Sequence, residues 1–364
     1  MTVRSLCTRF ADGAFLPLYG FFQTGFSNAI PMRIILPIRI GIVGAGSIVR
    51  QRHLPGLRLL EGVSVDVVAN STPASAEKFI KEEALAARVA DHWEALVNDP
   101  GIDVVWIGTH PDLHEPVTLA ALSAGKHVFC QARMARDLPE ARRMLAAAEA
   151  APDLVTMLCP PPYGLRQDAF VRHLLAKKLI GDIKELHLES LNGVFLDPTA
   201  PAHWRQRREK SGQNVMTLGI YTEVLQRWLG RIDWVEAEGR VAMPERDGYR
   251  VEIPEELEVR SEFAQGFPAR WNFSSIHSGD PVEALTLRGS GGRLRIDFLT
   301  EEIRLEKDGT VSLLDTPAEL SRPWQVERDF IDAVRSPALP RPRPSFEDGV
   351  AYMEVVHAVE EARI

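Results

Sequence analysis

The sequence is poor in the residues that mark disulfide-rich, metal-binding or membrane-spanning proteins. Its 364 residues include three cysteines, Cys7, Cys130 and Cys159, an odd number without metal-ligand spacing. This fits a reduced compartment, the cytoplasm, in which buried cysteines act as small apolar residues. The ten histidines also lack metal-ligand spacing, so we predict no metal site. No stretch is long and apolar enough to span a bilayer, so we expect no membrane contact.

Positive charge is not in excess either. The formal net charge is −8, from 42 Lys and Arg against 50 Asp and Glu. We therefore expect a small-molecule substrate, and we do not expect nucleic acid or an anionic membrane as a partner. Apolar residues make up 45% of the chain and charged residues 25%, an ordinary globular profile. A chain of 364 residues exceeds what one hydrophobic core usually serves, which predicts two domains.

Residues 1–37 precede the first regular pattern. They are apolar and aromatic in patches, and they lack a hydrophobic stretch followed by a small-residue cleavage site. Two interpretations of these residues are open: a weak targeting segment, or a true translation start at Met32. We expect residues 1–37 to be a leader that is disordered or not part of the fold.

A glycine turn after an apolar run organises the rest of the chain. The run Ile38–Val43 predicts a buried strand, and Gly44-Ala45-Gly46 leads from it into a helix near Ser47. Gly44 permits the tight turn, and Gly46 lets a pyrophosphate approach the backbone at the helix N-terminus. The third glycine position of this motif holds Val49. The strand–turn–helix context nevertheless favours a dinucleotide site over an ordinary turn.

Strands alternate with helices as far as Cys159. Further strands are predicted at 63–69, 103–108, 126–130 and 154–159, and helices at 74–87, 92–97, 115–124 and 138–150. Such alternation predicts a doubly wound parallel sheet, which makes residues 38–158 an N-terminal Rossmann domain.

The character changes after the prolines at 160–162, a stiff connector and a plausible domain boundary. A helix is predicted at 170–179, followed by strands with period-two alternation. Gly289–Gly292 and Asp308-Gly309 each predict a hairpin turn. Helices near 324–334 and 346–362 close the chain. Residues 159–364 are thus predicted to form a C-terminal α+β domain with a large open, mainly antiparallel sheet.

Four stretches resemble the Gfo/Idh/MocA family, the glucose–fructose oxidoreductase and inositol dehydrogenase type. They are GIVGAGSIVRQRHLPGL from Gly41, DVVWIGTHPDLH from Asp103, GKHVFCQARMA from Gly125, and HWRQRREKSGQNVMTLGIYTEVLQRWLG from His203. The resemblance runs from about Arg39 to the C-terminus. It implies NAD or NADP as cofactor and hydride transfer to or from sugars, inositols and related polyols. It also implies a homodimer or homotetramer formed through the C-terminal sheet.

The predicted cofactor-binding residues follow the strand ends. They are Gly44, Gly46, Ser47 and Ile48, then Asn70, Ser71 and Thr72, then Thr109, His110 and His114, and finally Gln131. Neither an acid nor an arginine follows the second strand, so NAD and NADP are both open. His114 matches a histidine common in the family, and a role in fixing loop geometry is an equal alternative.

The resemblance breaks at the usual catalytic positions. The family's Glu-Lys-Pro is replaced by Gln131-Ala132-Arg133, and the register on Gly219 places Thr217 and Tyr221 at the usual aspartate and histidine positions. The resemblance therefore implies that all three usual acid–base groups are replaced. Thr217, Tyr221 and Arg133 are the candidate catalytic residues, and Tyr163, His203, Glu223 and Cys159 are other protic candidates.

These replacements limit the chemistry. Tyr221 could exchange a proton with the substrate only if a cation lowered its pKa from about 10, and Arg133 is the candidate cation. Thr217 would share a helix face with Tyr221. Arg133 could instead bind a carboxylate or phosphate of the substrate. A packing role for Tyr221 and a surface salt bridge for Arg133 are the structural alternatives.

Three functions are open at this point. The first is an NAD(P)-binding oxidoreductase for a sugar-like or small polyol or keto substrate, with non-standard acid–base residues and weak or absent ordinary dehydrogenase activity. The second is a non-redox lyase, hydrolase or isomerase that retains a tightly bound nucleotide. The third is a catalytically inert regulatory protein that binds nucleotide or sugar.

Overall fold

The computed structural model describes residues 37–363. Residues 1–36 of the predicted leader lie outside this range. Within it, no helix is long and apolar enough to cross a membrane.

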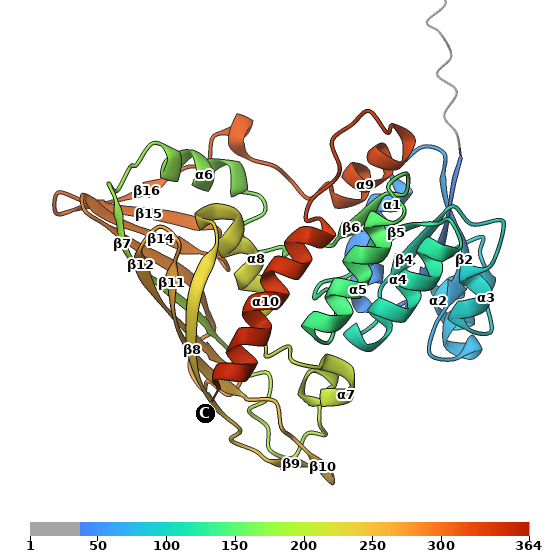
Figure 1. The fold of residues 1–364 in the computed structure, drawn as a ribbon, viewed down its shortest axis with the longest axis horizontal. Coiled ribbons are helices and arrows are strands. Elements are labelled where there is room, and N and C mark those ends of the chain that lie inside the picture. The colour runs from blue at the N-terminus through green and yellow to red at the C-terminus, as the bar shows by residue number, and fades with distance from the viewer. Residues whose placement is uncertain (1–36, 364) are drawn as a thin grey trace, which may run out of the picture. The chain divides into compact units, whose positions relative to one another are not determined.

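The first sheet has six parallel strands in the order β3-β2-β1-β4-β5-β6 (Figure 1). The strands are β1 (Ile38–Val43), β2 (Val63–Ala69), β3 (Arg88–Val89), β4 (Val104–Ile107), β5 (His127–Cys130) and β6 (Thr156–Leu158). The helices between them are the π-helix η1 (Val49–His53), α1 (Leu54–Arg58), α2 (Pro73–Glu82), α3 (Trp93–Val97), the short 3-10 helix η2 (Pro111–Leu113), α4 (His114–Ser123) and α5 (Leu138–Glu149). This confirms the predicted doubly wound sheet. Its strand order reverses between β1 and β4, where ligands bind in such folds.

The strands of this sheet are apolar on both faces because helices cover both. In β1, Ile40 and Ile42 belong to one buried cluster, with Trp106 and Phe129. Val43 belongs to the other cluster, on the opposite face. The near-continuous apolar runs of the sequence reflect this double burial.

The predicted helix after β1 is not regular. It passes through the π-helix η1 before α1 begins, with Pro55 in the first turn of α1. Proline is tolerated there because its missing N–H would have no partner in the first turn.

The second sheet has eight strands in the order β16-β15-β14-β13-β7-β12-β11-β8. Its members are β7 (Ile183–Leu191), β8 (Ile232–Arg240), β11 (Glu256–Phe263), β12 (Phe267–Ser274), β13 (Val282–Gly289), β14 (Gly292–Asp297), β15 (Glu302–Lys307) and β16 (Thr310–Leu314), and β9 (Glu245–Arg246) with β10 (Tyr249–Arg250) forms a separate hairpin. All neighbours are antiparallel except β12 and β7, which confirms the mainly antiparallel prediction. Both predicted hairpin turns are present, and Asp308 and Gly309 take the positive φ values that a tight hairpin needs.

Helices lie against one face of this sheet, as Figure 1 shows for α8 and α10. The helices of this half are α6 (Asp168–Ala176), η3 (Trp204–Gln206), α7 (Arg208–Ser211) and α8 (Leu218–Leu229), and a short 3-10 turn η4 (Ala318–Leu320) follows the sheet. On β7 the covered side is formed by Leu186, Leu188 and Ser190, which are buried, whereas His187 and Glu189 are partly exposed. The period-two pattern of the sequence is this alternation between covered and open faces.

The two closing helices join the halves of the fold. On α9 (Val326–Arg335), Phe330 and Ile331 lie in the same buried cluster as Ile40 of β1. The last helix, α10 (Phe346–Ala362), packs against both α5 and α8. The division at 158/159 stays a prediction, and the end of the chain packs on the Rossmann sheet rather than only on the second one.

A buried ion pair holds the segment that carries η3. Arg246 and Glu255 are both almost fully buried, with Arg246 Nη2 3.1 Å from Glu255 Oε1. The Glu255 carboxylate also accepts from the Gln206 side chain of η3 at 2.7 Å. The Arg246 guanidinium donates to the carbonyl oxygen of Asp197 at 2.7 Å. This pair therefore connects the β9–β11 region to the loop before η3.

Removing one charge of this pair should destabilise the fold strongly. Glu255→Gln keeps the side-chain size and leaves Arg246 buried without a counterion, which costs about 3–5 kcal/mol. The control is Glu236→Gln, which breaks the exposed pair with Arg260 and should cost less than about 1 kcal/mol. Urea denaturation measures both free energies of unfolding. Equal losses in the two variants would contradict this account.

Candidate functional site

The turn after β1 is shaped by close approach to the end of β4. Gly44 has φ +87°, and a Cβ added to it would lie 2.6 Å from Thr109 Cγ2 and 2.8 Å from the Gly108 carbonyl carbon. At Gly46 an added Cβ would meet only Gly108 O, at 4.0 Å. The first glycine is thus required by the protein itself, whereas the space beside the second is free of described protein atoms.

Val49, at the third glycine position of the motif, fits because β4 also ends in glycine. A Cβ on Gly108 would lie 2.4 Å from Val49 Cγ2. The missing side chain at 108 therefore makes room for the valine, and the helix can still pack closely on the sheet. This removes the main sequence objection to a dinucleotide motif.

The start of the helix is suited to phosphate. Gly46, Ser47 and Ile48 are exposed where the helix begins. The first N–H groups of a helix have no partner within it, and the helix dipole favours an anion there. Beside this turn, Thr109 Oγ1 is fully covered and has no hydrogen-bond partner within residues 37–363. These residues fit NAD or NADP, and Gly46, Ser47 and Ile48 would hold its phosphates.

The residues after β2 divide into two roles. Asn70 Oδ1 accepts from the Ala45 N–H at 3.3 Å, which fixes the glycine turn. The Thr72 hydroxyl accepts from the Ser75 N–H at 3.2 Å as the N-cap of α2. Ser71 is exposed, and its hydroxyl has only a long contact of 3.4 Å with Ser75 Oγ, so it is the best placed of the three to meet a ribose.

His114 and Gln131, predicted to bind the cofactor, are instead engaged inside the protein. His114 is fully buried, with Nδ1 2.9 Å from Arg133 O and Nε2 3.1 Å from Thr109 O. Burial lowers the pKa of His114, whereas the carbonyl oxygens that face both ring nitrogens oppose this shift, because only the charged ring can donate to both of them. The histidine thus ties the loop after β4 to the loop after β5, the alternative role considered for it.

The Gln131 side chain is buried and bonds to His53 Nε2. The other ring nitrogen, Nδ1, lies 2.6 Å from Glu327 Oε1. A neutral His53 that donates to Glu327 and accepts from the Gln131 amide satisfies all three groups. This buried chain links β5, η1 and α9. It uses Gln131 for packing the fold rather than for contact with a ligand.

His110 is exposed and meets the second half of the protein. Its ring stacks on Trp204 of η3, with centroids 4.5 Å apart and planes at 18°. Partial burial lowers the pKa of His110, and the charges of Lys210 and Arg205 act in the same direction. His110 is therefore a neutral ring at pH 7, placed between the two halves.

Arg133 is buried without a partner. Its side chain is only 3% exposed, and its stem packs on Gly219 of α8, 3.2 Å from where a Cβ would stand. Within residues 37–363 its guanidinium forms no ion pair and donates no hydrogen bond, and Nε is fully covered. Burial lowers the pKa of Arg133 to about 9, with Arg205 adding to the effect. It stays charged at neutral pH, and the surface salt bridge considered from the sequence is not present among these residues.

Thr217 and Tyr221 belong to a buried polar network on the covered face of the second sheet. The Tyr221 hydroxyl donates to Glu283 Oε2 at 2.6 Å, and Thr217 Oγ1 lies 2.8 Å from Ser190 Oγ. Ser190 pairs with Glu283 across β7 and β13, and burial raises the pKa of the Glu283 carboxyl. These contacts join α8 to β7 and β13.

The expected lowering of the Tyr221 pKa by Arg133 is wrong. The hydroxyl faces a carboxylate rather than a cation, and burial followed by Glu283 raises its pKa. Glu283 was not among the site residues predicted from the sequence. Its position in β13 carries the available signal, because it shares the inward register of Leu285 and Leu287 and pairs with Ser190.

Tyr163 follows β6 and stacks on Tyr221, with centroids 5.4 Å apart and planes at 15°. It is half-buried, and its hydroxyl bonds to no described residue. Burial raises its pKa, as does Glu283, whereas the charges of Arg205 and Arg52 oppose this. Tyr163 therefore offers a hydroxyl that has no partner among the described residues.

His203 and Arg205 flank Trp204 in the same region. Burial lowers the pKa of His203, and the Arg205 charge lowers it further. The Arg205 guanidinium lies 4.3 Å from the centre of the Trp204 ring and forms no ion pair within the described residues. Arg205 is solvent-exposed, and partial desolvation lowers its pKa.

The other two protic candidates are placed differently. Cys159 is buried, and its surroundings raise the pKa of the thiol. Glu223 binds Arg227 at 3.0 Å. Within residues 37–363, no three His, Cys, Asp or Glu side chains gather in a way that could hold a metal ion.

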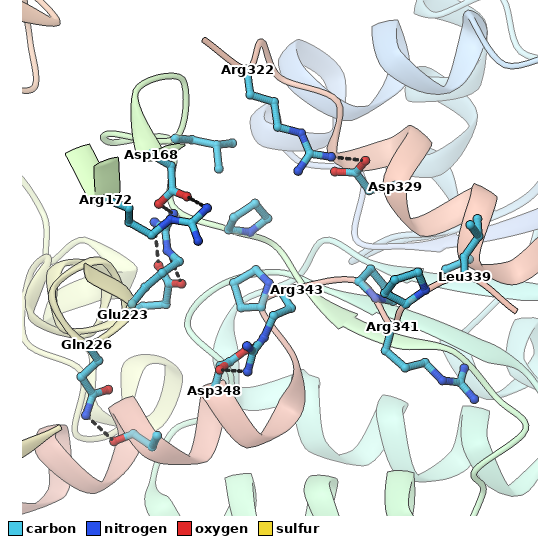
Figure 2. Close-up of a pocket in the computed structure, with 18 of the residues that line it drawn as sticks. Asp168, Arg172, Glu223, Gln226, Arg322, Asp329, Leu339, Arg341, Arg343 and Asp348 are labelled. Carbon is cyan, nitrogen blue, oxygen red and sulfur yellow. Dashed lines mark hydrogen bonds and ion pairs between the residues drawn. The ribbon is translucent and has the colours of Figure 1, made fainter. Parts of the chain in front are cut away.

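A groove of about 980 Å³ lies elsewhere, between α6, α8, α9 and the start of α10 (Figure 2). It is lined by neither the glycine turn nor Arg133. Its arginines all have partners: Arg172, Arg227, Arg231, Arg322 and Arg343 form ion pairs, and Arg341 donates to backbone carbonyls. The polar groups of this groove therefore satisfy one another, and we place the site at the glycine turn instead.

Comparisons with known proteins agree with this geometry. Residues 38–158 match the "Oxidoreductase family, NAD-binding Rossmann fold", and residues 169–295 match the "GFO/IDH/MocA C-terminal domain". The dTDP-3,4-didehydro-2,6-dideoxy-alpha-D-glucose 3-reductase of Saccharopolyspora spinosa is 28% identical over 78% of this chain and 83% of its own. The 1,5-anhydro-D-fructose reductase of Ensifer adhaerens is 31% identical over 49% of this chain, and that match spans 52% of the reductase.

A solved structure has the same fold. The levoglucosan dehydrogenase in complex with NADH and levoglucosan superposes with a TM-score of 0.80 at 20% identity, covering 90% of this chain and 97% of that one.

The fold and the glycine turn define an NAD-binding oxidoreductase-type protein with a Rossmann domain. With both family domains matched in order, the chain belongs to the Gfo/Idh/MocA oxidoreductase family.

The two glycines of the turn should respond differently to substitution. Gly46→Val should lower affinity for NAD(P) at least about tenfold and leave the melting temperature unchanged, because the added side chain enters ligand space. Gly44→Val should lower the melting temperature, since its φ is positive and the backbone of β4 is in contact. Calorimetric titration and thermal unfolding measure the two effects. A stable Gly46→Val protein that binds both nucleotides as the wild type does would overturn this assignment.

Proposed function

We propose that the protein is an NAD(P)-dependent oxidoreductase acting on a sugar-like or small polyol or keto substrate. The observation that carries the proposal is the open space beside Gly46 at the start of a helix, at the point where the strand order reverses. Two of the sugar-type reductases and dehydrogenases among its relatives, named above, support this substrate class.

The residues divide the work as follows. The nucleotide, when bound, supplies or accepts the hydride. Gly46, Ser47 and Ile48 orient it by binding its phosphates, and Ser71 meets its ribose. The substrate would lie against the ends of β4, β5 and β6, where His110, Arg133 and Tyr163 project.

Hydride transfer to or from a C–O centre also needs a proton at the oxygen. We assign this to the Tyr163 hydroxyl, which is free of internal bonds and half-buried. Burial and Glu283 raise its pKa, and Arg205 and Arg52 offset this only in part, so the hydroxyl is better suited to donate a proton than to accept one. In the reducing direction Tyr163 would donate its proton to the keto oxygen, and in the oxidising direction it would accept one.

Tyr221 acts here as a positioning residue. It is fully buried and its hydroxyl is held by Glu283, so its ring is a fixed surface on which Tyr163 stacks. Thr217, bonded to Ser190, stabilises the same network. This assignment replaces direct proton transfer by Tyr221 with support of a neighbouring tyrosine.

The non-redox and inert alternatives differ in measurable output. A lyase, hydrolase or isomerase would turn over substrate without net change in NAD(P)H, and an inert sensor would bind ligand without turnover. The reductase and dehydrogenase names of the relatives support the redox reading. Absorbance at the nicotinamide band with a panel of polyols and keto-sugars separates the three.

We further propose a cytoplasmic homodimer or homotetramer formed through the open face of the second sheet. Exposed apolar side chains on its strands, such as Trp234 and Val311, support a contact there. Sedimentation of the purified protein measures the oligomeric state.

Tyr163→Phe should lower kcat about 100- to 10,000-fold, because the proton at the substrate oxygen loses its exchange partner. Affinity for NAD(P) should not change, since Tyr163 is remote from the glycine turn. Tyr249→Phe is the matched control, because that hydroxyl binds Glu209 on the surface. Steady-state kinetics and calorimetry measure both. Full activity in Tyr163→Phe would refute this role, and nucleotide binding without any turnover in the wild type would favour the inert alternative.

A further inference from the structure

Cations without partners gather around the proposed substrate position. Arg133 follows β5, Arg205 lies in η3, and Arg52 lies in η1. None of the three forms an ion pair with another residue of the range 37–363. His110 after β4 stacks on Trp204, over which Arg205 lies, and Arg52 lines a pocket together with Pro162, the residue before Tyr163.

Several arginines elsewhere in the described structure have bonding partners. The buried Arg246 has Glu255 as counterion, and the arginines of the groove in Figure 2 each have a carboxylate or carbonyl partner. Arg133 is as deeply buried as Arg246 but has no such partner. A buried unpaired charge is strongly unfavourable, so a fold retains one only when something else supplies the counterion.

The nearby carboxylate cannot serve. Glu283 accepts from the Tyr221 hydroxyl at 2.6 Å and forms no ion pair with Arg133. Arg133 Nε is fully covered and donates to no described residue. The other two nitrogens of the guanidinium, Nη1 and Nη2, are not among the fully covered atoms. The guanidinium therefore presents its outer edge, the side that binds an oxyanion in a two-point fork.

The phosphates of the nucleotide are not the missing anion. They belong at the turn after β1, and Arg133 follows β5, which is two strands away across β4. With strands about 4.8 Å apart, this separation is on the order of 10 Å. Arg133 also packs on α8 through Gly219, on the side of the second sheet.

We propose that the substrate is an acidic sugar derivative, whose carboxylate or phosphate binds Arg133 with Arg205 beside it. This inference rests on the proposed oxidoreductase function and adds the charge of the substrate. The oxyanion supplies the counterion that the fold lacks, and the planar fork of arginine selects it over a neutral hydroxymethyl group.

The test compares acidic sugars with their neutral counterparts. Calorimetry on the NAD⁺-saturated protein at fixed ionic strength would use D-glucuronate and D-glucose 6-phosphate against D-glucose, and D-galacturonate against D-galactose. We expect at least one acidic member to bind at least tenfold more tightly than its neutral counterpart. Preference for the uronates identifies a carboxylate, and preference for the sugar phosphate identifies a phosphate.

Variants show whether Arg133 is responsible. Arg133→Met should lower the affinity for the acidic sugar to that for the neutral one. Arg133→Lys should also weaken binding of the acidic sugar, because one ammonium cannot reproduce the fork. NAD⁺ affinity should be unchanged in both. The melting temperature of Arg133→Met should equal or exceed that of the wild type, because a buried unpaired charge is removed. Arg328→Met is the control, an exposed arginine of α9 that also lacks an ion pair among residues 37–363.

Several outcomes overturn the inference. Equal binding of acidic and neutral sugars, no binding of any acidic sugar, or unchanged binding in Arg133→Met would each do so. Loss of NAD⁺ affinity in Arg133→Met would assign the arginine to the cofactor instead. A lowered melting temperature in that variant would show a structural role. If the wild type binds no nucleotide at all, the proposed oxidoreductase function itself fails, which is a distinct result.

Discussion

The site depends on how closely the turn after β1 approaches the end of β4. Gly44 and Gly108 both lack side chains where their backbones meet, and Val49 occupies the room that Gly108 leaves. Because these contacts involve backbone atoms, they cannot relax by a change of rotamer. The approach sets the direction of the helix that follows, and with it the position of the N–H groups that would receive phosphate. Asn70, through the Ala45 N–H, adds a fixed contact from β2.

Around that turn the structure separates polar groups that serve the fold from those that are free. The side chains of His114, His53, Gln131 and Glu327 are each bonded to other groups inside the protein. The side chains of Tyr163 and Arg133 have no such bond among the described residues, and the two residues follow β6 and β5, two neighbouring strands of the first sheet. In a low-dielectric interior, an unused donor or charge is costly, so its persistence is informative about a ligand. The difference between bonded and unbonded polar groups is a better guide to the position of the site than the size of any groove.

Some of the fold was predictable from the sequence, for reasons that are local. The apolar run Ile38–Val43, the turn at Gly44-Ala45-Gly46 and the hairpin at Asp308-Gly309 depend on neighbours in the chain, and the structure has all three. The helix after β1 is less regular than predicted, because a π-helix precedes Pro55. The short strand β3 was not predicted, since two residues carry no periodic signal.

The sequence by itself determined the class of fold and the position of the glycine turn, since each is a property of residue type and spacing. Only the tertiary structure decided what each polar side chain faces. Tyr221 meets Glu283, which lies 62 residues further along the chain, and this reverses the direction of its pKa shift. His53 meets Glu327 across 274 residues. Arg133 meets no counterion among the described residues, and no local pattern could show that. Charge and burial at a site come from segments far apart in the sequence, which a reading of neighbours cannot place together.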